Sequence, residues 1–136
     1  MKKILSIAIL SLMISFQAKS TIVTINATAA NKFSPDSVVI RWGDTIQFGN
    51  MSGHRAIEVS STAWNANGKT AAAGGFNTVS AGNTITNLNI GVHYYVDTHF
   101  VATDTMKGRI CVLQRIAPLS DCNDLFISEY IRGKRK

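Results

Sequence analysis

The sequence predicts an all-β protein, a two-sheet β-sandwich with Greek-key connections. Seven or eight short runs rich in Val, Ile, Thr and aromatic residues follow one another between Thr21 and Gln114. Gly, Asn, Asp and Pro separate these runs at regular spacing, which is typical of short strands joined by turns. The repeated alternation of strands and helices that builds a parallel sheet is absent from the pattern.

Each predicted strand either alternates apolar and polar residues or is bounded by turn residues. The predicted strands are Thr21–Asn26, Ser37–Trp42, Thr45–Asn50, Arg55–Ser60, Asn83–Asn89, Val92–Asp97 and Arg109–Gln114. Phe33 begins a Phe-Ser-Pro turn and is expected to plug the core with its ring, and Gly43 begins a tight turn. Small residues, Asn and Gly dominate Trp64–Phe76, which is expected to be a loop. Four large aromatic residues are expected in the core or lining a pocket: Trp42, Phe48, Phe76 and Tyr95.

Residues 1–20 are predicted to be an export signal. Lys2 and Lys3 give a basic start, Ile4–Phe16 is apolar and uncharged, and Ala18-Lys19-Ser20 offers small residues at the cleavage spacing. The apolar run is shorter than the roughly 20 residues of a bilayer-spanning helix, which favours export over a membrane span. The mature chain is therefore expected to begin near Thr21 and to be periplasmic or secreted.

Residues 21–117 are expected to form one domain, followed by a C-terminal extension at 118–136. An apolar face at helical spacing predicts a short helix over Leu125–Arg132 that packs on the sandwich. The extension ends in the basic run Arg132–Lys136, either a solvated terminus or a contact for anionic lipid or a partner.

The formal net charge of +6 comes mainly from the two ends of the chain. Without Lys2, Lys3 and Lys19 the chain has 11 basic and 8 acidic residues, and four of the basic ones lie in the tail after Ile131. The body of the domain is thus close to neutral. It lacks the basic stripe with interleaved aromatic residues that nucleic-acid binding requires, so nucleic acid is not an expected partner.

Cys111 and Cys122 are the two cysteines of the chain. In an exported protein a disulfide between them is the default, and it would stabilise the fold by roughly 3 kcal/mol. Two metal thiolates are the alternative, which the absence of CxxC spacing disfavours. If Cys111 points outward from its strand, the disulfide would pin the extension to the outer face of the sheet.

Catalytic motifs are absent, so no enzyme activity is expected. The sequence has no GxSxG elbow, and neither Lys-Ser/Thr nor a helix start follows Gly74-Gly75 as a phosphate loop requires. Residue types that bind metals are instead concentrated between Gly91 and Cys111. Asp97, His99 and Met106 lie in that stretch, and His54 is their natural upstream partner.

A series of short motifs carries a resemblance to a known family. They are FSP at 33–35, GDTI at 43–46, NMSGH at 50–54, TAWNANG at 62–68, GGF at 74–76, GVHYY at 91–95 and MKGRI at 106–110. In this order and spacing, the chain from about Lys32 to Leu113 resembles the cupredoxins, in particular the plastocyanin-like single-domain exported proteins of bacteria. The resemblance implies a copper site at one end of the sandwich, electron transfer, a redox or copper-handling protein as partner, and a monomer.

The family builds its copper site from one His after the fourth strand and a Cys, a His and a Met on the last loop. By resemblance, His54 matches the first His and Met106 the axial Met, while Asp97 stands where the family has its Cys. The second His belongs at Phe100, one residue after His99. A carboxylate is a hard ligand that favours Cu(II) or Zn(II) over Cu(I), so a blue, fast electron-transfer site is not expected.

Two functions therefore stay open. In the first, copper binds in a non-blue site of His54, Asp97 and His99, with Met106 near the axial position. This requires the loop from Asp97 to Met106, which is one residue longer than the plastocyanin loop that it resembles, to bring His99 to the metal. In the second, the same fold is a metal-free binding or structural module, His54 only hydrogen-bonds a neighbouring loop, and Met106 fills the core. His93 shares a strand face with Asp97 and is expected to be a core or rim histidine bonded to Asp97 or to a backbone carbonyl.

Overall fold

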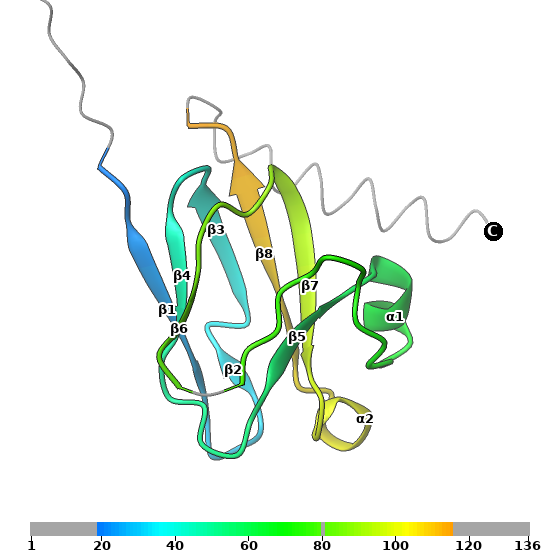
Figure 1. Ribbon diagram of the computed structural model, residues 1–136. Coiled ribbons are helices and arrows are strands. Elements are labelled where there is room, and N and C mark those ends of the chain that lie inside the picture. Colours follow the sequence, from blue (N-terminus) through cyan, green and yellow to red (C-terminus); the bar gives the residue numbers. More distant parts are fainter. Residues whose placement is uncertain (1–18, 80, 116–136) are drawn as a thin grey trace, which may run out of the picture.

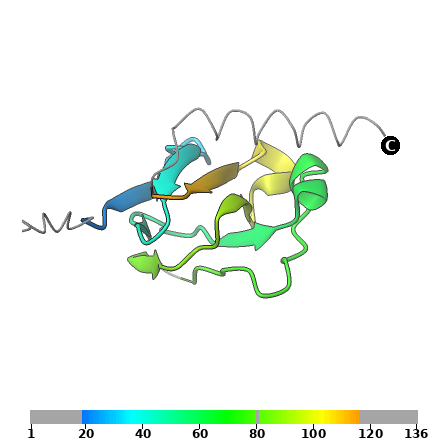
Figure 2. The same cartoon turned by 90° about the horizontal axis from the view of Figure 1, so that it is seen from above.

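The computed structural model describes residues 19–79 and 81–115, which form two four-stranded sheets packed face to face (Figures 1 and 2). The predicted helix at 125–132 and Cys122 lie outside these residues, as does most of the predicted export signal. The helix, the disulfide and the signal thus stay predictions. Among the described residues, the structure has no helix long and apolar enough to cross a membrane.

The first sheet has the strand order β2-β1-β4-β6. Its members are β1 (Ile22–Ala27), β2 (Phe33–Ser34), β4 (Thr45–Phe48) and β6 (Asn83–Ile85). β1 and β4 run parallel, and the other two pairs are antiparallel.

The second sheet has the order β3-β8-β7-β5. Its members are β3 (Ser37–Arg41), β5 (Ala56–Val59), β7 (Gly91–Asp97) and β8 (Lys107–Leu113). β3 and β8 run parallel, while β7 is antiparallel to both β5 and β8. The chain crosses between the sheets several times, so the predicted β-sandwich is confirmed.

The core lies between the inner faces of the two sheets, as alternating strand residues require. Tyr95 is at its centre, with ring centroids 4.8 Å from Phe33 and 5.6 Å from Phe48. Phe76 packs against this cluster from the side. The predicted positions of Phe33, Phe48, Phe76 and Tyr95 are thus confirmed. The prediction for Trp42 is wrong: β3 ends at Arg41, and Trp42, in the following turn, is 54% exposed.

Two short helices cover the outer face of the second sheet (Figure 1). α1 (Ser61–Asn65) begins directly after the predicted strand Arg55–Ser60 and overlaps the start of the predicted loop Trp64–Phe76, and α2 (Val101–Asp104) lies in the last loop. Ser60 caps α1, its hydroxyl accepting a hydrogen bond from the Ala63 N–H at 3.2 Å. Neither helix has enough residues to show an apolar period of its own, which is why the sequence did not predict them.

The predicted strand Asn83–Asn89 is also shorter in the structure, where β6 ends at Ile85. Asn87 has a φ of +57°, a left-handed conformation that a strand cannot contain. The segment 86–89 therefore leaves the sheet and turns towards the start of β7, where it forms one wall of a pocket.

Candidate functional site

Strand register brings His54 and Asp97 together at one end of the sandwich. Asp97 is the last residue of β7 and pairs with Ala56 of β5. His54 precedes Ala56 by two residues, and its backbone N–H donates to the Met51 carbonyl at 2.9 Å. The predicted pairing of one upstream histidine with the loop after Val92–Asp97 is therefore present.

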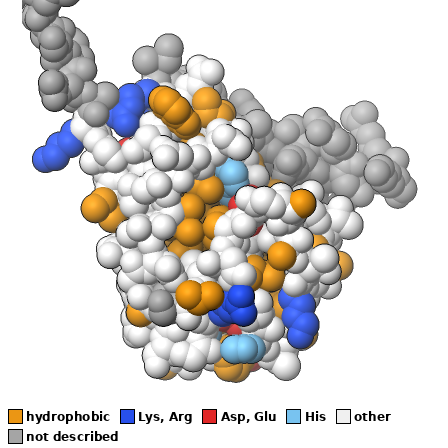
Figure 3. All heavy atoms as spheres, in the orientation of Figure 1, with side chains coloured by type: hydrophobic (Ala, Val, Ile, Leu, Met, Phe, Trp, Pro, Cys, Tyr) orange, Lys and Arg blue, Asp and Glu red, His pale blue; other side chains and the backbone are white. Residues whose placement is uncertain are grey.

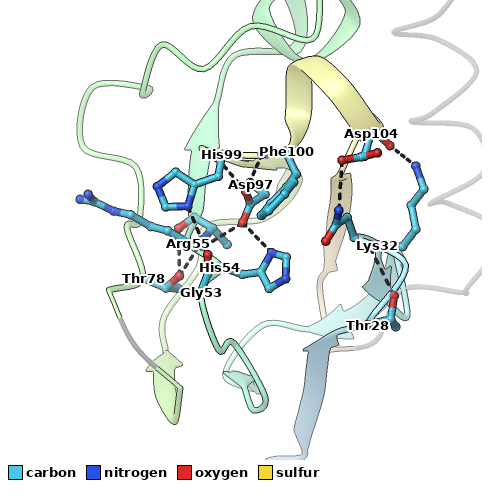
Figure 4. A network of polar contacts seen from close by, with 12 residues as sticks. Thr28, Lys32, Gly53, His54, Arg55, Thr78, Asp97, His99, Phe100 and Asp104 are labelled. Atoms are coloured by element: carbon cyan, nitrogen blue, oxygen red, sulfur yellow. Dashed lines mark hydrogen bonds and ion pairs between the residues drawn. The ribbon is translucent and has the colours of Figure 1, made fainter.

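The Asp97 carboxylate is fully buried and accepts hydrogen bonds on both oxygens (Figure 4). Oδ1 accepts from the backbone N–H groups of His99 at 2.7 Å and Phe100 at 2.8 Å. Oδ2 accepts from the Arg55 N–H at 2.8 Å and lies 3.3 Å from His54 Nδ1. A carboxylate has about four acceptor positions, so these four partners occupy its whole capacity.

These hydrogen bonds offset the free-energy cost of burying the Asp97 carboxylate. A buried charge is costly unless it is hydrogen-bonded or paired, and bonds from N–H groups to an ionised oxygen are among the stronger ones. The three backbone donors come from two loops, the one before β5 and the one after β7. Asp97 therefore fastens these two loops to each other.

Phe100 stands where the resemblance places the second histidine. Its ring centroid lies 5.0 Å from that of His54, and it packs against the edge of the core. The His54 side chain is 11% exposed, held between this ring and the Asp97 carboxylate. An apolar ring that cannot bind a metal thus occupies the position of the second ligand.

His99 lies in the same loop as Phe100, but its ring does not face the Asp97 carboxylate. Its ring Nδ1 lies 3.2 Å from the Gly53 carbonyl oxygen, while its backbone N–H faces Asp97. His54 and His99 both line an open pocket of about 560 Å³ at this end of the sandwich. The structure thus places His99 at the rim of the site, without a contact between its ring and the Asp97 carboxylate.

Met106 is buried in the main core, and its carbonyl accepts from the Asp97 N–H at 2.9 Å. The last loop is also held at α2 and Thr105, by residues of the turn between β1 and β2. Lys32 donates from Nζ to the Asp104 carbonyl and to Thr105 Oγ1, and Asn31 Nδ2 donates to Asp104 Oδ2 at 3.1 Å (Figure 4). These contacts between the β1–β2 turn and α2 were not predicted, because nothing in the sequence links residues more than seventy positions apart.

Arg55 ties the loops in the position where the family commonly has an Asn. Its backbone N–H bonds to Asp97, and its side-chain Nε donates to Asn77 Oδ1 at 2.8 Å. His93 is not part of this network. It contacts Glu58 and the carbonyl of Asn89, so the prediction of a rim histidine bonded to a backbone carbonyl is confirmed, and the alternative bond to Asp97 is absent.

The donor set at this end does not fit a blue copper ion. Such a site needs a thiolate and two imidazoles in one plane, with a weak axial ligand. Here a carboxylate replaces the thiolate, one imidazole faces it, and Phe100 fills the second position. Among residues 19–79 and 81–115, no three His, Cys, Asp or Glu side chains are grouped closely enough to hold a metal ion.

Comparison with known proteins rests on structure, since no protein-family model and no curated protein matches the sequence. A Sinorhizobium pseudoazurin superposes with a TM-score of 0.51 at 20% identity, over 71% of this chain and 76% of that chain. Spinach plantacyanin gives 0.52 at 18% identity, over 68% and 99%. A Cu-containing nitrite reductase from Thermus scotoductus gives 0.49 at 23% identity, over 69% of this chain and 23% of its own. The strand order and the superpositions on pseudoazurin and plantacyanin together show that the chain has a cupredoxin-like fold.

Proposed function

We propose that this protein is an exported cupredoxin-like binding module, neither an electron carrier nor an enzyme, whose loop end is fastened by a carboxylate in place of a metal ion. The observation that carries the proposal is the saturation of Asp97 by three backbone N–H groups and His54. Export rests on the signal-like residues 1–20.

The chemistry of the site argues against electron transfer. A copper ion that cycles rapidly needs ligands that suit both of its oxidation states, and the copper–thiolate bond supplies that. Asp97 offers hard oxygen, and Phe100 offers no ligand at all. What remains is a rigid end surface, because the loops around His54 and His99 are tied to one buried group.

One measured separation favours a second candidate function, the binding of a divalent cation such as Cu(II). His54 Nδ1 and Asp97 Oδ2 are 3.3 Å apart, slightly beyond the usual 2.7–3.2 Å range of an N–H···O bond. Two ligands bound at about 2.0–2.1 Å to one ion lie about 3.3 Å apart at the tetrahedral angle that Zn(II) prefers and about 2.9 Å apart at the right angle that Cu(II) prefers, so either ion would need little movement of the two side chains. In this candidate His54 and Asp97 would hold the ion in place of the proton between them, and His99 and Met106 would be the further candidate ligands.

Titration of the protein from Thr21 to Lys136 with Cu(II), followed by visible absorption and EPR, separates the two candidates. The binding module predicts no stoichiometric Cu(II) signal that depends on His54. The cation site predicts one equivalent of non-blue Cu(II), lost in His54→Ala. An intense blue band would contradict both.

His99→Ala is the matched control, since it removes an imidazole from the same pocket. A signal lost in His99→Ala but kept in His54→Ala would come from surface binding at His99, and the binding module would stand. A signal lost in both variants would support the cation site with His99 as a third ligand.

A further inference from the structure

A second pocket lies away from the loop end, between the open edges of the two sheets. Its volume is about 380 Å³, and its walls come from the segment 72–76, the segment 86–89 and the strands β5 and β7. Figure 3 shows this face, with a histidine beside an acidic side chain next to exposed apolar groups. Glu58 and His93 are the two titratable residues that line the pocket.

His93 joins the elements around this pocket. Its Nδ1 lies 2.6 Å from Glu58 Oε1 on β5, and its Nε2 lies 2.8 Å from the Asn89 carbonyl oxygen on the wall 86–89. Glu58 extends the chain of contacts to the other wall, because its Oε2 accepts from the Phe76 N–H at 3.2 Å. One ion pair thus connects β5, β7 and both pocket walls.

The identity of the partners fixes the protonation of the ring. A backbone carbonyl can only accept, so the 2.8 Å contact requires a proton on Nε2. An ionised carboxylate also only accepts, so the 2.6 Å contact requires a proton on Nδ1. With Glu58 ionised, both contacts form together only when His93 is an imidazolium.

We propose that His93 is a proton-controlled clamp on this pocket, which holds the wall 86–89 as an imidazolium and releases it as a neutral ring. On deprotonation, the remaining proton stays on Nδ1, facing the negative charge of Glu58. The Nε2 lone pair then faces the lone pairs of the Asn89 carbonyl oxygen. Two acceptors at hydrogen-bond distance repel each other, so the wall separates from the ring and the pocket widens.

The electrostatic environment agrees with this geometry. The hydrogen bond to Glu58 raises the pKa of His93 above its usual value, against the lowering effect of burial, and the Asn89 carbonyl adds to the increase. The pocket segments 72–76 and 86–89 contain no charged residue, so Glu58 is the charged group that faces the ring from the pocket walls. With Glu58 ionised, the clamp is therefore closed below the elevated pKa of His93 and opens as pH rises through it.

NMR spectroscopy of the protein from Thr21 to Lys136 tests the proposal directly. In the wild type, the His93 ring signals are expected to titrate with a midpoint above about 6.5, the ordinary value for histidine. The backbone amide signals of Leu88 and Asn89 are expected to shift with the same midpoint. A His93 midpoint at or below the ordinary value, or Leu88 and Asn89 signals that do not follow it, would overturn the clamp.

Glu58→Gln is the decisive variant, because it keeps the size of the side chain and its acceptor for the Phe76 N–H. The glutamine amide can donate to Nδ1 of a neutral ring, whose Nε2–H still bonds to the Asn89 carbonyl. The wall should then stay attached at about pH 9, with Asn89 signals that match the acidic form of the wild type. An unchanged transition in Glu58→Gln would refute the mechanism. His99→Gln, a histidine variant far from this pocket, should leave the transition as in the wild type.

Discussion

Replacing Asp97 by asparagine tests whether the carboxylate fastens the loop end. The amide can keep one oxygen for the N–H groups of His99 and Phe100, but its NH₂ group then faces the Arg55 N–H, which was bonded to Oδ2 at 2.8 Å. The variant thus loses a charge-assisted bond, worth about 1.5–3 kcal/mol, and leaves the part-buried Arg55 N–H without a partner, at about 1–3 kcal/mol. Together the expected loss is about 2.5–6 kcal/mol of unfolding free energy.

A loss of this size is large beside the 5–15 kcal/mol that usually stabilises a domain. For a domain of about 100 residues, each kcal/mol shifts the melting temperature by about 4–8 °C, so Asp97→Asn should melt at least about 10 °C lower. Thermal unfolding followed by circular dichroism, with a chelator present, measures the shift without a contribution from metal. Asp104→Asn is the control: it changes a carboxylate of the same loop that is only partly buried, and it should cost less than about 1 kcal/mol.

The reasoning fails if Asp97→Asn melts within a few degrees of the wild type in the presence of chelator. In that case the loops would be held by their other contacts, such as those between Lys32 and the end of α2. A loss of stability that appears only when Cu(II) is supplied would instead support the cation site.

Three further predictions concern other parts of the chain. Tyr95→Phe should raise the unfolding free energy by about 1 kcal/mol in urea titrations, because the buried Tyr95 hydroxyl has no hydrogen-bond partner within residues 19–79 and 81–115, and a loss above about 1 kcal/mol would contradict this. Asp97→Cys alone should give no blue colour with Cu(II), whereas Asp97→Cys combined with Phe100→His should, because only the double variant restores both missing ligands. Cleavage before Thr21 should leave its α-ammonium at Asp44 Oδ1, 2.9 Å from the Thr21 nitrogen. Asp44→Asn should then cost more stability at pH 6 than at pH 9, because the ammonium, with an ordinary pKa of about 7.7–8.0, is charged only at the lower pH; equal losses would contradict the pairing.

The sequence predicted the sandwich because strand alternation and turn residues report directly on which faces are buried. It did not predict α1 and α2, which are too short for a period, or the exposure of Trp42, whose side chain follows the end of β3. When an aromatic residue ends a predicted strand, no further alternating residues follow it. The pattern therefore does not show whether its side chain faces the core or the solvent.

For the site, the sequence placed Asp97 at the end of a strand and named His54 as its upstream partner. The structure ends β7 at Asp97 and pairs it with Ala56, two residues after His54. The sequence could not show that backbone N–H groups would saturate the carboxylate, because these donors are present at nearly every residue. The sequence also did not predict the direction of the His99 side chain. That direction depends on how a loop folds between Asp97 and the contacts of Asp104 with Asn31, a geometry that residue order does not encode locally.

The carboxylate at the loop end has a consequence for how the protein matures. A fastener built from Asp97 is synthesised with the chain and is present in every copy. In the proposed binding module, assembly of this end would not wait for a second component to be delivered, and it would be independent of metal supply and of oxidants that attack a thiol. Such a module would reach its final form wherever it folds, including surroundings from which copper is withheld.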